Sequence, residues 1–205
     1  MRKLIILTLL LGTLHSLVRA EVQIQSGDII LQPMDCWACG LIEAEEETIY
    51  SHIGIAFRVG DIIEVAEAFG KVRKITLDEF NKKTQRDQKL KILRFRNEQI
   101  QQDFLKRNTE LLVLFENEFN GLNYDAQFLW NNFDSNGNEK LYCSEFVSKF
   151  LQASFGLEMP IKRMHFQKNR EAWIKFFKGN VPDNQWGNSP GDYERSDLFY
   201  EVGEL

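Results

Sequence analysis

The segment 141–151 reads Leu-Tyr-Cys-Ser-Glu-Phe-Val-Ser-Lys-Phe-Leu. Its bulky apolar residues recur at helical spacing: Phe146, Val147, Phe150 and Leu151. The segment is therefore predicted to be a buried helix with Cys143 near its first turn. The partial positive charge of a helix N-terminus favours the thiolate form of a cysteine, and the thiolate is the nucleophile. The simpler interpretation is a small buried cysteine that only packs as an apolar side chain.

The length and composition of the chain suit one globular domain, expected over residues 21–205. The 205 residues are 43% apolar and 12% aromatic, which is enough for a sizeable core. The first twenty residues have the pattern of an export signal: a basic start, an apolar run over 4–11 and the small-x-small sequence Val18-Arg19-Ala20. That run is too short to span a bilayer. The mature chain is therefore expected to be periplasmic or secreted, without a transmembrane segment.

The net charge limits the classes of partner. The full chain carries −5 at pH 7, and loss of residues 1–20 would remove Arg2, Lys3 and Arg19 but no acid, which leaves −8. Binding to nucleic acid needs clustered basic residues, so this acidic balance argues against it. It also gives no support for binding to an anionic membrane surface.

The chain contains three cysteines, and two of them form a Cys-x-x-Cys pair, Cys36 and Cys39. In an exported protein a disulfide is favoured, with two free thiols as an alternative. A thioredoxin-like redox centre should follow a strand and open a long helix, for which the sequence gives little sign. Zinc would need two more ligands, and His52 and His165 are the only histidines after residue 20. No metal or cofactor is expected.

Secondary structure is predicted from periodicity and from turn and capping signals. Strands are expected over 27–32, 51–57, 61–68, 71–75 and 90–95, the second and third joined as an antiparallel hairpin by the turn 59–61. Helices are expected over 41–47, 76–83, 97–120, 143–155 and 169–178. The spacing of Asp134, Asn136, Asn138 and Glu145 resembles a calcium loop only weakly, because Glu139 stands where that loop needs glycine and Glu145 falls inside the predicted helix. Residues 121–140 are therefore predicted to be a turn. The tail 182–205 is expected to wrap the surface. The fold class is α+β.

A cysteine nucleophile needs a base within reach, and the base needs an orienting group. His165 follows Cys143 by only 22 residues, mostly helical, and is not expected to reach the start of the helix. His52 stands on a strand from which an imidazole can point at a helix end, although most such histidines are structural. Glu64 and Glu67 on the neighbouring strand point to opposite faces. Glu67 is expected to face the helix and Glu64 the solvent.

Four stretches are familiar as a set: 27–30 (Gly-Asp-Ile-Ile), 51–54 (Ser-His-Ile-Gly), 67–73 (Glu-Ala…Val-Arg) and 142–147 (Tyr-Cys-Ser-Glu-Phe-Val). In this order and spacing they resemble the circularly permuted papain-like cysteine hydrolases of the YiiX/YaeF type, within the NlpC-like superfamily. The resemblance covers about residues 27 to 151. It implies a small antiparallel sheet packed on helices, with the histidine before the cysteine in the chain.

The resemblance also implies roles for individual residues. Cys143 matches the nucleophile, His52 the base and Glu67 the third residue of an acyl-transfer site that attacks an amide or ester carbonyl. Residues expected to bind substrate are Asp28, Gln32 and Tyr142. The substrate is expected to be a cell-envelope peptide or an acyl lipid, and the protein a monomer.

Two other functions remain open from the sequence. One is a non-catalytic binding module on the same fold. The other is a thiol oxidoreductase that uses Cys36 and Cys39.

Overall fold

The computed structural model describes residues 22–205, so the expected export signal at residues 1–20 lies outside the described chain. The strands are β1 (Ile29–Gln32), β2 (His52–Val59), β3 (Ile62–Phe69), β4 (Lys71–Thr76), β5 (Lys91–Phe95), β6 (Asn132–Phe133), β7 (Glu139–Lys140), β8 (Lys162–Arg163), β9 (Trp186–Gly187) and β10 (Phe199–Glu204). The helices are α1 (Cys39–Glu46), α2 (Leu77–Asn81), α3 (Glu98–Lys106), α4 (Asn108–Glu118), α5 (Cys143–Phe155), α6 (Arg170–Phe176) and α7 (Pro190–Glu194). The fold class is α+β, as predicted.

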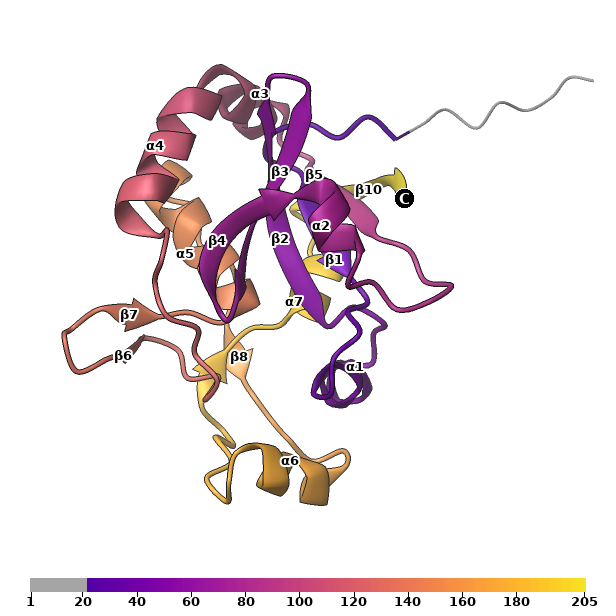
Figure 1. Ribbon diagram of the computed structural model, residues 1–205, viewed down its shortest axis with the longest axis vertical. Coiled ribbons are helices and arrows are strands. Elements are labelled where there is room, and N and C mark those ends of the chain that lie inside the picture. The colour runs from indigo at the N-terminus through magenta and orange to yellow at the C-terminus, as the bar shows by residue number, and fades with distance from the viewer. Residues whose placement is uncertain (1–21) are drawn as a thin grey trace, which may run out of the picture.

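Six strands form one antiparallel sheet in the order β10-β5-β1-β2-β3-β4 (Figure 1). All five predicted strands are present, with ends shifted by one or two residues. The predicted hairpin of β2 and β3 is confirmed. Gly54 of β2 lets the two strands approach, because a Cβ there would lie 2.4 Å from Cγ1 of Val65. The pairing of β1 with β2 sets Gln32 opposite His52, at the end of the sheet where the candidate site lies.

Each face of the sheet has its own apolar core. On one face Phe146 and Phe150 of α5 pack in a cluster that includes Ala66 of β3. On the other face Phe80 of α2 packs with Val65 of β3. The predicted capping box of Thr76 and Glu79 begins α2 and so fixes where Phe80 meets the sheet. None of the helices within residues 22–205 is both long and apolar enough to cross a membrane.

The Gly27-Asp28 sequence anchors the start of β1. Gly27 has φ +91°, and a Cβ on it would lie 2.5 Å from the ring of Phe104. The buried carboxylate of Asp28 accepts hydrogen bonds from Nε and Nη2 of Arg94, both at 2.7 Å, and from the backbone N–H of Gln25 at 2.8 Å. Burial raises the pKa of Asp28, and the pairing with Arg94 offsets this only in part. The buried carboxylate therefore depends on the Arg94 guanidinium to compensate its charge.

Replacing Arg94 by alanine is expected to destabilise the protein by about 3 kcal/mol or more, because the buried Asp28 carboxylate would lose its cation. Urea unfolding at neutral pH measures this change. The control is Arg86→Ala, which removes an arginine side chain that is 95% exposed and should cost less than about 0.5 kcal/mol. Equal losses in the two variants would contradict the structural role of the ion pair.

The prediction of a single long helix over 97–120 is wrong. Two helices, α3 and α4, meet at Arg107, whose backbone (φ −97°, ψ 13°) leaves the helical region. The apolar spacing conceals the break, because Phe104 and Leu111 are seven residues apart and stay on one face across it. No apolar side chain lies between them on that face, and the Arg107 guanidinium instead donates to the carbonyl of Ser154 on α5.

The prediction that the tail wraps the surface is also wrong. β10 is an edge strand of the main sheet, paired with β5. Tyr193 of α7 is fully buried, and its hydroxyl donates to the backbone carbonyl of Ser144 at 3.0 Å. Glycine, proline and charge in the tail suggest a loop, but Tyr193 and Phe199 pack in the core and hold it there. The end of the chain thus supports the first turn of α5.

Candidate active site

Helix α5 carries Cys143 at its first residue. The N-cap residue, Tyr142, has an extended backbone and makes no capping hydrogen bond with its side chain. The first N–H groups of a helix have no partner within the helix, so those of α5 stay available to a ligand. The Cys143 thiol is free and 6% exposed.

His52 lies at the first residue of β2 and is 3% exposed. Its Nε2 is 2.6 Å from Oε2 of Glu67, and Cys143 lies close enough to the ring to act on its pKa. Burial lowers the pKa of His52, but the hydrogen bonds and charges of Cys143 and Glu67 outweigh burial and raise this pKa to about 9. The structure thus brings together the three side chains that the sequence predicted as a triad, with His52 as an imidazolium at neutral pH.

Glu67 is held from its other side by Arg73, which the sequence analysis had not assigned to the site. Arg73 donates from Nε at 3.0 Å and from Nη2 at 2.8 Å, both to Oε1 of Glu67. The register of β3 and β4 sets Glu67 opposite Arg73, so cross-strand pairing was the signal that could have found it. Burial raises the pKa of Glu67, but the bonds to His52 and Arg73 prevail and lower it. Oε2 of Glu67 thus faces His52, and Oε1 faces Arg73.

Aromatic rings enclose the imidazole. Phe80 of α2 stacks on His52 at 5.5 Å between ring centroids, and Phe69 of β3 presents its edge at 6.0 Å. Gln32 supports this packing from behind, since its Nε2 donates to the carbonyl of Phe80 at 2.6 Å. These contacts exclude water from the pair of His52 and Glu67 and limit rotation of the ring.

The predicted orientation of β3 is wrong in one respect. Glu67 is fully buried as expected, but it shares its face with Val65, which α2 covers, whereas α5 covers the opposite face. Glu64 does not face solvent freely either: it lies at 3.0 Å from Nζ of Lys74, with its side chain 30% exposed. Cys143 and His52 meet because both begin their elements at the same end of the sheet, a relation that the alternation of side chains does not reveal.

A cavity opens at Cys143. Its apolar and aromatic lining comprises Ile42, Tyr124, Phe128, Tyr142, Met164, Phe166, Trp173 and Pro190, and its polar lining Glu45, Glu46, Ser51, Ser144, His165, Asn188 and Ser189. Walls come from α1, from the start of α5 and from the segment around α6. A thiol at the end of a largely apolar cavity is an arrangement suited to a reaction on a substrate with an apolar chain.

Only one of the three residues predicted to bind substrate lines the cavity. Tyr142 lines the cavity as expected, and its hydroxyl accepts the backbone N–H of Asn188 at 3.1 Å. Asp28 and Gln32 lie outside the cavity lining, in the bonds to Arg94 and to α2. His165, expected to be out of reach of Cys143, lines the same cavity from an exposed position. The chain leaves α5, turns through β8 and returns to the opening, so sequence separation underestimated its reach.

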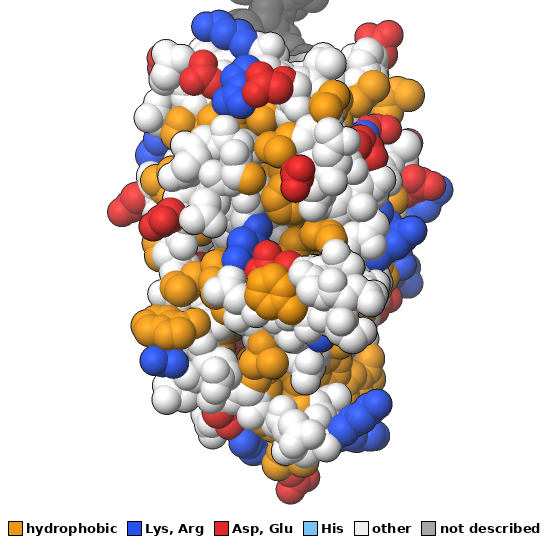
Figure 2. Space-filling view, turned by 90° about the vertical axis from the view of Figure 1, so that its left-hand side faces the viewer, with side chains coloured by type: hydrophobic (Ala, Val, Ile, Leu, Met, Phe, Trp, Pro, Cys, Tyr) orange, Lys and Arg blue, Asp and Glu red, His pale blue; other side chains and the backbone are white. Residues whose placement is uncertain are grey.

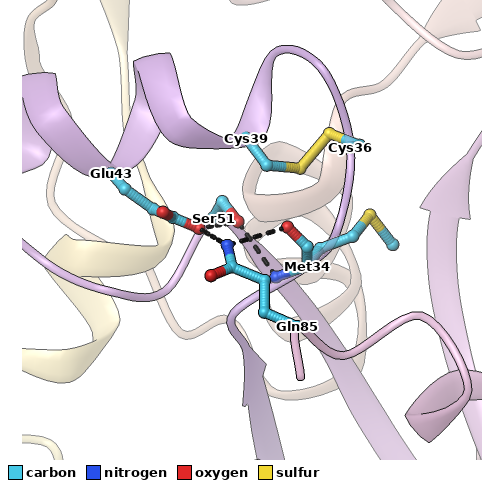
Figure 3. Close-up of a disulfide and its surroundings, with 6 residues drawn as sticks. All are labelled: Met34, Cys36, Cys39, Glu43, Ser51 and Gln85. Carbon is cyan, nitrogen blue, oxygen red and sulfur yellow. Dashed lines mark hydrogen bonds between the residues drawn. A yellow bond between two sulfur atoms is a disulfide. The ribbon is translucent and has the colours of Figure 1, made fainter. Parts of the chain in front are cut away.

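Cys36 and Cys39 form a disulfide that closes the turn leading into α1 (Figure 3). Nearby, Oε1 of Glu43 accepts hydrogen bonds from Oγ of Ser51 at 2.8 Å and from Nε2 of Gln85 at 2.7 Å. These bonds tie α1, one wall of the cavity, to the residue that precedes His52. The favoured prediction for the cysteine pair, a disulfide, agrees with this geometry.

The fold and the site together define a class. A buried imidazole between a carboxylate and a cysteine at a helix N-terminus, on an antiparallel sheet, is the arrangement of papain-like cysteine hydrolases, here with the histidine before the cysteine. A family model described as "Permuted papain-like amidase enzyme, YaeF/YiiX, C92 family" matches residues 23–185. The chain belongs to this family, and membership implies an amide hydrolase. The comparison with curated proteins finds no match.

A solved structure with the same fold is that of a protein from Escherichia coli O157:H7, whose title calls it metalloprotein yiiX. The TM-score is 0.73 at 21% sequence identity, over 88% of this chain and 97% of that chain. A metal does not fit the present site. Within residues 22–205 no group of three or more His, Cys, Asp or Glu side chains is arranged to hold a metal ion. The only cysteine at the site is Cys143, whose partner is the imidazole of His52.

Proposed function

We propose that this protein is a cysteine amidase in which Cys143 is the nucleophile, His52 the acid and base, and Glu67 the orienting carboxylate. One observation carries the proposal: a buried imidazole that is bonded to a carboxylate and lies beside the free thiol at the start of α5. The alternative of a non-catalytic binding module leaves this pairing unexplained, because burying an imidazole and a carboxylate is costly without a role for them.

The reaction follows from the protonation states. The Cys143 thiolate attacks the amide carbonyl, and the C–S bond forms as the carbonyl oxygen takes the negative charge. His52 gives its proton to the leaving amine, and the acyl group remains on sulfur. A water molecule, deprotonated by the now neutral His52, then releases the acid and restores the thiolate–imidazolium pair. Glu67 stays ionised throughout and holds the ring with Nδ1 toward sulfur.

Two donors are available for the oxyanion. The first is the backbone N–H of Cys143, which has no capping partner at the start of α5. The second is the hydroxyl of Tyr124, which lines the cavity. Burial, together with the charges of Cys143 and Asp125, raises the pKa of Tyr124 well above its ordinary value, so the phenol keeps its proton and can donate it.

The apolar cavity favours an acylated substrate over a cell-envelope peptide. Peptidoglycan peptides carry carboxylates and ammonium groups, and most of the wall beside Cys143 is formed by rings and a methionine that offer these groups nothing. An acyl chain, in contrast, gains free energy from every methylene that leaves water. We therefore propose an N-acyl amide or an acyl ester as the substrate. Export guided by the signal expected at residues 1–20 would bring the protein to the compartment that holds this substrate.

The test is product analysis by mass spectrometry. The purified protein is incubated separately with long-chain N-acyl amino acids, with acyl-ester lipids and with peptidoglycan fragments, and Cys143→Ala serves as the blank. We expect release of free fatty acid by the wild type alone. Cleavage of peptidoglycan without fatty-acid release would reject the acyl substrate but keep the amidase. Equal products from wild type and blank would reject the amidase.

The pKa of His52 predicts how hydrolysis depends on pH. Because this pKa is raised from 6.5 to about 9, the imidazolium persists at neutral pH and is lost as pH rises through about 9. The rate of hydrolysis at low substrate concentration is therefore expected to fall above pH 9. A fall that already begins near pH 6.5 would contradict the pairing of His52 with Cys143 and Glu67.

A further inference from the structure

The segment 161–178 carries a charge opposite to that of the whole chain. It holds six basic residues and one acid, Glu171, whereas the full chain has 25 basic residues and 30 acidic ones. Charges more than about 10 Å from a surface contact are largely screened at ordinary ionic strength. A partner is therefore affected by the charges that lie near its contact on this segment, and not by the net charge of the chain.

Two basic residues of this segment that lack a carboxylate partner in the described chain are exposed on and just after helix α6. Ile174 and Lys175 are exposed on the side of the helix that carries Glu171, because residues three and four apart are neighbours there. Lys178, also exposed, follows the end of the helix with a left-handed backbone (φ 52°). We call Ile174, Lys175 and Lys178 the α6 face. Within residues 22–205 no carboxylate lies at ion-pair distance from either lysine, whereas the basic residues that precede them in the segment include three held by carboxylates of other elements.

Apolar side chains are exposed on and beside the α6 face. Ile174 is 44% exposed, and Trp37, which stacks on Phe176 with ring centroids 5.9 Å apart, is 61% exposed. In Figure 2 hydrophobic and Lys or Arg side chains lie next to one another at the lower end of the molecule, where Figure 1 places α6. Lysines beside bulky apolar residues are typical of helices that lie in the interface of a bilayer.

The inner side of the same helix forms a wall of the cavity at Cys143. Trp173 is 1% exposed and lines that cavity, while its neighbours Ile174 and Lys175 face solvent. Helix α6 is thus a partition between the cavity and the outside, at one end of the long axis and away from the six-stranded sheet (Figure 1).

We propose that the α6 face, flanked by Trp37, docks this protein on an anionic lipid surface. The lysines meet the headgroups, and Ile174 and Trp37 enter the apolar boundary beneath them. Nucleic acid, the other common polyanion, offers no such apolar layer. Docking in this orientation places the cavity directly behind α6, close to the membrane in which acyl amphiphiles reside. Only this last step, the supply of substrate, rests on the proposed function.

The test is flotation with lipid vesicles, using Cys143→Ala so that no lipid is cleaved. We expect binding to vesicles of equal parts phosphatidylcholine and phosphatidylglycerol, weakening as salt is raised, and little binding to phosphatidylcholine alone. The double variant Lys175→Gln/Lys178→Gln should bind roughly 20-fold more weakly, because each lysine near an anionic surface contributes about fivefold. The matched control, Arg96→Gln/Lys106→Gln, removes the same charge from exposed positions near α3, at the other end of the molecule, and should change binding less than about twofold.

Three results would overturn the docking surface: no binding to the mixed vesicles, equal binding to phosphatidylcholine alone, or equal losses in the two double variants. Hydrolysis of a short-chain soluble substrate by Lys175→Gln/Lys178→Gln, with Cys143 intact, separates the two proposals. Lost vesicle binding with normal hydrolysis supports docking through the α6 face. Vesicle binding without hydrolysis in the wild type would reject the amidase and leave the docking surface standing.

Discussion

Replacing His52 by alanine is expected to slow alkylation of Cys143 by iodoacetamide at pH 6 on the order of 100-fold, and to lower hydrolysis on the order of 10³-fold or more. The thiolate is the reactive form, and an ordinary free thiol with a pKa of about 8.5 is hardly ionised at pH 6. The imidazolium of His52, with its pKa raised to about 9, supplies the positive charge that stabilises the thiolate. Its removal leaves only the field of the helix N-terminus.

His165 provides a matched control for His52. His165 lines the same cavity as Cys143 but lies at an exposed position. His165→Ala should change the alkylation rate by less than about threefold, and Cys143→Ala should abolish labelling altogether. The proposed pairing would be rejected if His52→Ala and wild type were labelled at the same rate while both remained folded.

Replacing Glu67 by glutamine is expected to lower hydrolysis by about 10²- to 10⁴-fold, as loss of the orienting carboxylate does in other triads. The amide keeps the size of the side chain but removes the charge, so both the tautomer and the pKa of His52 change. Burial then becomes the stronger influence on the pKa of His52 and lowers it, so the fall of activity at high pH should move below pH 9. A rate profile against pH measures both effects.

Glu64→Gln is the matched control, because Glu64 stands on the same strand but binds Lys74. Its hydrolysis rate should stay within about twofold of the wild type, since a partly exposed ion pair contributes little. Thermal unfolding checks that each variant is folded. A large loss in Glu64→Gln together with an unchanged rate in Glu67→Gln would identify the other carboxylate as the orienting group and reject the assignment made here.

The buried helix and the strands could be read from the sequence because each depends on local periodicity. Cys143 lies in the first turn of its helix, as predicted, and Gly156 is the left-handed cap at the end. The cysteine–histidine pair could be proposed as well, because few residue types activate a thiol and the chain after residue 20 offers only two histidines. The resemblance to permuted papain-like hydrolases supplied the choice of His52, and the match over residues 23–185 confirms the family.

The sequence-based predictions fail where contacts between residues far apart in the chain determine the structure. Alternation along β3 predicts that Glu64 and Glu67 lie on opposite faces, but it does not tell which face α5 covers. Arg73 went unassigned because its role depends on the register between β3 and β4. The tail looked like a surface loop because the bonds that hold it, such as that of Tyr193 to α5, span some fifty residues.

The sequence by itself determined five strands of the main sheet, the helix of Cys143, the family and the residue types of the site, because short-range spacing specifies helices and strands and because the chemistry of a thiol nucleophile restricts its partners. Only the tertiary structure decided which side chains meet. It joined Glu67 to Arg73, enclosed His52 between Phe69 and Phe80, and built the apolar cavity from α1, α5 and α6. The physical reason is that such contacts are selected by the packing of whole elements, whose relative positions no local pattern encodes.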